Sequence, residues 1–188
     1  PRALGIIPFE TRALVVKPLG KGFIVCYTSP VGENDAILGV VLDEGGKAIA
    51  PATEIVKTPS PIGWFEVVPN KTGVVAVWAE TTASENASIF AVAMDTRGSV
   101  ISAPSRIGSH AVSWHLHESD GALVLGSISA VPQLDAPKRG PGALIAATGH
   151  TITLQQIDQE GRAAGAAVVV ANGRQPSRDL DFAEVGGH

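Results

Sequence analysis

The chain is short of aromatic residues, cysteine and long apolar runs, and the last two shortages each exclude a structural feature. Aromatic residues make up 5% of its 188 residues. Cys26 is the single cysteine, which excludes an internal disulfide and a multi-cysteine metal site; we interpret it as a small buried apolar residue. The longest small-apolar run, 163–171, is far shorter than the roughly 20 residues that span a bilayer. We therefore expect no transmembrane segment.

The chain also lacks any run of charges of a single sign. The 14 basic and 18 acidic residues give a net charge of -4 and form no run of either sign. A nucleic-acid-binding protein usually carries a basic stripe. The one local pair, Lys138 and Arg139, lies in a stretch rich in proline and glycine, where a solvated loop tip is the simpler interpretation and ligand binding the alternative. We expect no nucleic-acid partner.

What the chain has is small apolar residues broken by turn formers. Apolar residues make up 45% of the chain, and it contains 21 glycines and 13 prolines. Frequent turns between short apolar runs favour many strands over long helices. The composition therefore predicts an all-β protein.

One motif recurs three times: Ile, an apolar run, Asp, two variable residues and Gly. The Ile-to-Asp step is six residues and the Asp-to-Gly step is three in every copy, at 37–46, 89–98 and 152–161. Such an Asp accepts a backbone hydrogen bond from two residues later, and the Gly takes a positive φ, as a hairpin turn with a bulge requires. Each copy is predicted to be a β-hairpin; in the second, we place the strand after the turn at 99–102.

Other residues recur with nearly the same period. Trp64 and Trp114 lie 50 residues apart, and Ile55, Ile107 and Val170 each follow the motif aspartate by twelve residues. A period near 50 residues with four short strands indicates the blades of a β-propeller. A β-sandwich lectin fits the strands but not this spacing. We predict one propeller segment over 1–188, with blade units at about 9–61, 62–110 and 111–171 and partial units at 1–8 and 172–188.

In this architecture the chain resembles bacterial β-propeller repeat proteins, many of which are exported, and the resemblance favours an extracellular or periplasmic location. It carries over no functional residue, because the marks of the WD-repeat and sialidase families are absent. An open stack of blades leaves an unpaired strand edge, whereas closed propellers have about 4–8 blades. We expect this segment to be completed by remaining blades or by a protein partner.

His115 and His117 are the candidates for metal binding. Residues two apart on a strand face the same side, so both imidazoles are able to approach one ion. A zinc site needs three or four converging ligands, and two histidines supply only half of that number. An exposed strand face is the simpler interpretation, and we expect no cofactor.

The tryptophans Trp64, Trp78 and Trp114 have two interpretations. A stacking platform for a sugar or peptide is one, and Trp64 and Trp114 are the ligand-binding candidates in that case. Packing between adjacent blades is the other, and we favour it because large aromatic side chains contribute most when they are buried. The same packing role is expected for the phenylalanines Phe9, Phe23, Phe65 and Phe90.

No catalytic constellation is present in the sequence. There is no Gly-x-Ser-x-Gly elbow, and Cys26 has no evident histidine partner. Our leading hypothesis is a non-catalytic binding or scaffold module that presents the loops 28–35, 81–87 and 129–149 to a protein or glycan. The rival is part of a propeller hydrolase or lyase whose active site lies in the central channel.

Overall fold

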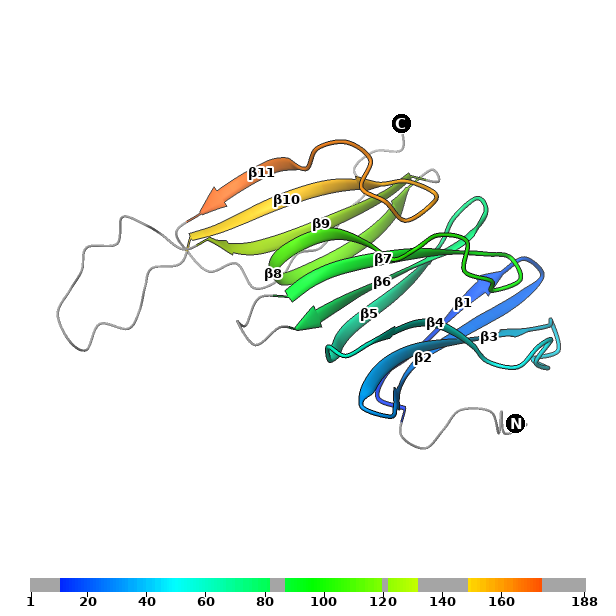
Figure 1. The fold of residues 1–188 in the computed structure, drawn as a ribbon. Coiled ribbons are helices and arrows are strands. Elements are labelled where there is room, and N and C mark those ends of the chain that lie inside the picture. Colours follow the sequence, from blue (N-terminus) through cyan, green and yellow to red (C-terminus); the bar gives the residue numbers. More distant parts are fainter. Residues whose placement is uncertain (1–10, 82–86, 120–121, 132–148, 174–188) are drawn as a thin grey trace.

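The computed structural model describes residues 11–81, 87–119, 122–131 and 149–173, and every element in them is a β-strand. The strands form two antiparallel sheets, one at each end of the molecule in Figure 1. No helix in these residues is long and apolar enough to cross a membrane. The all-β prediction is confirmed.

The first sheet has the order β1-β2-β3-β4, from β1 (Leu14–Leu19), β2 (Gly22–Val31), β3 (Asn34–Leu42) and β4 (Thr53–Thr58).

The second sheet has seven strands in the order β11-β10-β9-β8-β7-β6-β5, and its longest strand is shared by two blades. The part of β8 from Ser105 to Ala111 pairs with β7, and the part from Ala111 to Ser119 pairs with β9. We call β1–β4 the first blade, β5–β7 with the start of β8 the second, and the end of β8 with β9–β11 the third. The bounds are β5 (Ile62–Pro69), β6 (Gly73–Thr81), β7 (Ala87–Asp95), β8 (Ser105–Ser119), β9 (Ala122–Val131), β10 (Gly149–Ile157) and β11 (Val168–Gly173).

The three repeated turns form as predicted, but a single β-bridge and no second strand directly follows each of them. In the second copy, the backbone N–H of Arg97 donates to Oδ1 of Asp95 at 2.8 Å, and the N–H of Ser99 donates to the same oxygen at 2.9 Å. The turn glycines have positive φ angles of 76°, 79° and 77°. The aspartate therefore holds the turn from inside, and glycine removes the steric cost of the left-handed residue.

The strand that we placed at 99–102 was wrong. Only one bridge, between Met94 and Val100, follows the turn, and regular pairing resumes at Ser105. Between them, the hydroxyl of Ser102 accepts the N–H of Ala93, so a side chain replaces a strand carbonyl. Pro104 then offers no N–H for a ladder. The fourth strand of each blade therefore begins some ten residues after the motif aspartate, as it does at Thr53 and Val168.

The predicted loop at 28–35 was also wrong. β2 continues to Val31 and β3 begins at Asn34, so only two residues connect them. Most of the loops at 81–87 and 129–149 lies outside the described residues, as does nearly all of the predicted partial units at 1–8 and 172–188. The predicted blade limits remain a prediction; β8 runs through the one at 110/111.

Two apolar seams join the blades. The first seam lies between the first and second blades, and the stacked pair Trp78 and Phe90, with ring centroids 5.7 Å apart, packs in it. Cys26 is fully buried there, as predicted, and burial raises the pKa of its thiol to about 12. The second seam lies between the second and third blades and buries Val75, Val77, Ile89, Ala91, Ala93, Ile107, Ala111, Leu116, Leu123, Leu125 and Ile157.

The turn glycines also bring neighbouring blades together. A Cβ atom on Gly98 would lie 2.6 Å from Cγ2 of Val41 in the first blade, and one on Gly161 would lie 3.3 Å from the backbone of Val92 in the second. A Cβ atom on Gly46, in the first blade, would meet nothing within 4 Å. The hairpin turn of one blade therefore packs against the blade before it.

Candidate functional site

The first strands of the three blades lie next to one another. β1 lies beside β5, and β5 contacts the part of β8 that belongs to the third blade, through Glu66 and Leu116. Within the described residues, β1 pairs only with β2, and β5 pairs only with β6. Each therefore leaves one backbone edge free of strand pairing in this part of the chain.

A groove of about 400 Å³ lies between β1 and β5. Its walls include Leu14 and Lys17 on β1 and Trp64 and Glu66 on β5. Trp64 is 61% exposed, and Lys17 is partly exposed. Among the described residues, the Lys17 ammonium forms no ion pair. The groove thus combines an aromatic face, a cation and a carboxylate.

Glu66 reaches from the groove toward the third blade. Its Oε2 accepts the backbone N–H of Leu116 at 3.2 Å, and its Oε1 lies 3.6 Å from Nδ1 of His115. The side chain of Glu66 is 22% exposed. Leu116 faces Leu125 in the β8–β9 ladder, but its N–H points away from β9 to reach the carboxylate. Glu66 therefore links β5 to β8, most strongly when His115 is protonated.

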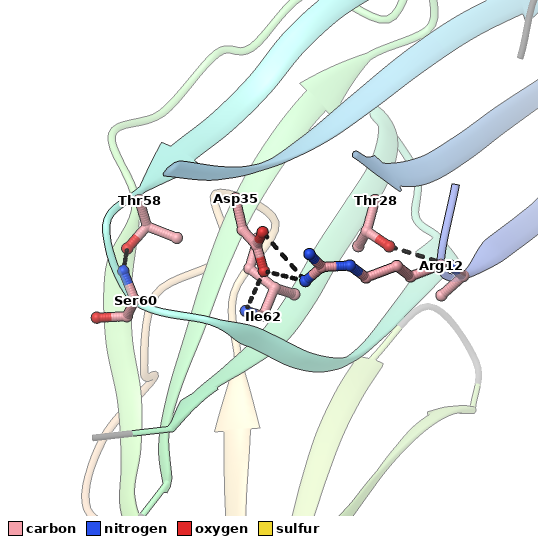
Figure 2. A network of polar contacts seen from close by, with 7 residues as sticks. Arg12, Thr28, Asp35, Thr58, Ser60 and Ile62 are labelled. Atoms are coloured by element: carbon pink, nitrogen blue, oxygen red, sulfur yellow. Dashed lines mark hydrogen bonds and ion pairs between the residues drawn. The ribbon is translucent and has the colours of Figure 1, made fainter. Parts of the chain in front are cut away.

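A second carboxylate holds the start of β5. Asp35 accepts two hydrogen bonds from Nη1 of Arg12, at 3.2 and 3.3 Å, and its Oδ2 accepts the backbone N–H of Ile62 at 3.1 Å (Figure 2). Nearby, Thr28 accepts the N–H of Ala13. Ile62 stands two residues before Trp64, so Asp35 positions the strand that carries the exposed indole.

The structure separates the three tryptophans. Trp78 is 1% exposed, which confirms its packing role, and Trp114 is half-buried against the second seam. The prediction that Trp64 packs between blades was wrong, because the edge position of β5 leaves its ring in solvent. The packing role predicted for Phe23 was also wrong, because this residue is 41% exposed. Phe65 is buried and Phe90 packs at the first seam, as predicted, whereas Phe9 lies outside the described residues.

The remaining candidates from the sequence are two histidines and two basic residues. His115 and His117 lie two apart on β8, opposite Gly126 and Val124, and therefore face one side of the sheet. In the described part of the chain, no three His, Cys, Asp or Glu side chains gather closely enough to hold a metal ion. Lys138 and Arg139 lie outside the described residues.

Sequence reasoning missed Lys17, Asp35 and Glu66. A signal was available for two of them, because Lys17 and Glu66 are single charges within otherwise apolar strands. A charge placed there is stable only if its strand face reaches water or a partner. Asp35 gave no such signal, since it follows Glu33 and Asn34 in a stretch that was interpreted as a polar loop.

Comparison with solved structures identifies the fold. The chain superposes on the GH43_1 enzyme from Xanthomonas citri complexed with xylotriose with a TM-score of 0.50 at 9% identity, covering 88% of this chain and 57% of that one. The same enzyme complexed with xylose gives a TM-score of 0.49 at 8% identity, covering 86% of this chain and 55% of that one. No family model and no curated protein matches the sequence.

The likeness confirms the β-propeller segment that the 50-residue period predicts. The chain spans little more than half of the length of the enzyme on which it superposes. At this level of identity the comparison establishes the fold and no more. The chemistry of this chain has to be inferred from its own groove.

Proposed function

We propose that this chain is part of a β-propeller enzyme of the hydrolase or lyase class that acts on a glycan, and that it binds the sugar in the groove between β1 and β5. Trp64 is the observation that carries the proposal. Trp64 is 61% exposed on an otherwise well-packed blade, which leaves a large apolar side chain in water. The apolar face of a sugar ring covers such an indole, while its hydroxyls remain hydrogen-bonded.

The size and the polar groups of the groove support a small ligand. Its volume of about 400 Å³ falls in the range of roughly 300–1,000 Å³ that is typical of small-molecule sites, which combine apolar walls with a few polar groups. Lys17 and Glu66 supply those polar groups. The solved neighbour with xylotriose is a propeller enzyme that holds a sugar, which makes this ligand class the natural one to test.

Glu66 is the residue that we propose for the chemistry. It is a carboxylate in the wall of the groove, with Nδ1 of His115 3.6 Å away, and positioned carboxyl groups serve as general acids and bases. Hydrolysis of a glycosidic bond generally uses two carboxyl groups, and Glu66 is the only carboxylate among the described walls of the groove. This observation favours a second candidate, a glycan-binding module without catalysis.

Calorimetric titration of the chain with xylotriose, cellotriose and trigalacturonate tests the binding. We expect at least one of them to bind, and Trp64→Ala to weaken that binding about 10-fold because a ring contact is lost. Phe23→Ala removes an exposed aromatic side chain outside the groove and serves as the matched control. Absence of binding across the panel, or equal binding by Trp64→Ala, would contradict the proposal.

Release of reducing sugar from the bound glycan separates the two candidates. An enzyme should lose about 100-fold or more of its rate in Glu66→Gln, with binding of the sugar retained. A binding module should release no sugar in either form, although Trp64→Ala still weakens binding.

A further inference from the structure

We infer that the groove selects an acidic sugar, with the carboxylate of a uronic acid residue at Lys17 and its ring against Trp64. The inference rests on the proposed function and goes beyond it by naming the class of sugar. It starts from Lys17, the only cationic residue among the described residues that line the groove. Within the described residues, no carboxylate neutralises its ammonium group.

The other charge in the groove is already engaged. Both carboxylate oxygens of Glu66 have partners on β8, the N–H of Leu116 at 3.2 Å and the imidazole of His115 at 3.6 Å. Both oxygens of this carboxylate are therefore directed toward the third blade. The unpaired charge that the groove offers to a ligand is positive.

The two walls of the groove supply different contacts for the ligand. Lys17 lies on β1 and Trp64 on β5, so the cation and the aromatic face come from opposite walls of one groove. A ring that rests on the indole leaves a charged substituent free to approach the other wall. A hydrogen-bonded pair of ammonium and carboxylate is stronger than one between neutral groups, which makes the acid preferable to a neutral sugar of the same shape.

The rest of the chain does not attract anions in general. Its net charge is -4, and no basic run accompanies Lys17. Recognition is therefore local, through one charge. The affinity should fall only slowly with added salt, in contrast to the steep dependence of a polyanion bound along a basic stripe.

Titration with trigalacturonate and with its methyl ester tests the inference, because the two ligands share their rings and differ in charge. We expect the acid to bind the unaltered chain about 10-fold more tightly than the ester. Lys17→Ala should abolish this preference and leave the affinity for the ester unchanged, and Lys17→Arg should retain it. Lys57→Ala, on the outer strand β4, is the control and should behave as the unaltered chain.

Several results would overturn the inference. If the ester or xylotriose binds as tightly as the acid, or if Lys17→Ala weakens acid and ester equally, the groove does not select charge, while the proposed glycan function stands. If a short oligo-glutamate binds through Lys17 and trigalacturonate does not, the ligand is an acidic peptide. If no sugar binds at all, the proposed function itself fails. Circular dichroism of each variant confirms that it is folded.

Discussion

The two seams of this segment join blades of similar design through different connections. At the first seam, the chain leaves β4 at Thr58 and enters β5 at Ile62 through a short link that contains Pro59 and Pro61. At the second seam, β8 passes from one blade to the next as a single strand of 15 residues, bent at His110, whose φ is 57°. The first connection interrupts strand pairing, and the second preserves it.

This difference determines where a ligand has room. Across the first seam, β1 and β5 belong to separate sheets, and the groove with Trp64 lies between them. Across the second, β5 and β8 belong to one sheet, and Glu66 reaches from one strand to the other. The described residues thus place a groove at the first seam, where Asp35 holds only the start of β5, and a side-chain bridge from Glu66 to β8 at the second.

Alanine at the turn glycines should have the largest effect on stability. Gly98→Ala adds a methyl group that meets Val41 across the first seam, at a residue with positive φ, so we expect a loss of about 2–4 kcal/mol in the free energy of unfolding. Gly46→Ala carries the same backbone cost without a neighbour and should lose about 1–2 kcal/mol. Urea unfolding measures both. Equal losses would show that the glycine serves the turn alone.

Removing the carboxylate at the first seam should have the next largest effect. Asp35→Ala leaves the N–H of Ile62 without its acceptor, and we expect a loss of about 1–3 kcal/mol in the free energy of unfolding. The contact with Arg12 adds little, because that side chain is largely exposed. Glu54→Ala, on the exposed part of β4, is the control. A loss no greater than that of the control would mean that Asp35 does not hold the seam.

The blade architecture could be predicted from the sequence because it depends on local rules. The Asp-x-x-Gly turns and the apolar strands before them are specified without reference to distant residues. The exposure of Trp64 could not be predicted, since it depends on which backbone edge lacks a neighbouring strand. Trp78 has a similar local sequence, yet it is buried because it lies on a central strand. The partners of Glu66 and Asp35 are likewise 23 or more residues away along the chain.

The bend in β8 gives a smaller prediction. His110 is exposed and holds a left-handed conformation that favours glycine. We expect His110→Gly to change the free energy of unfolding by less than about 1 kcal/mol, toward higher stability, and His110→Val to lower it by about 1–3 kcal/mol. At the corresponding place in the first blade, Thr58→Gly should destabilise, because it removes the acceptor for the N–H of Ser60. If His110→Gly melts at a lower temperature than His110→Val, the left-handed conformation at His110 is contradicted.

Labelling of the Cys26 thiol measures how often the first seam opens, without any substitution in the chain. Burial raises the pKa of its thiol from 9.0 to about 12, so the folded chain holds no reactive thiolate at neutral pH. We expect a thiol reagent to label the native chain only as fast as the seam opens. The stabilisation from the neutral buried thiol is present below pH 9.0 and is lost as the pH rises toward about 12. Rapid labelling of the native chain would contradict a closed first seam.

The most direct test of the account is the response of the three indole N–H signals in an NMR titration with the oligosaccharide that binds best. Trp64 lines the open groove, Trp78 is buried within the first seam, and Trp114 packs at the bridged second seam. The account predicts that the signal of Trp64 shifts in proportion to occupancy while the other two stay in place. A shift of Trp114 without one of Trp64 would contradict it.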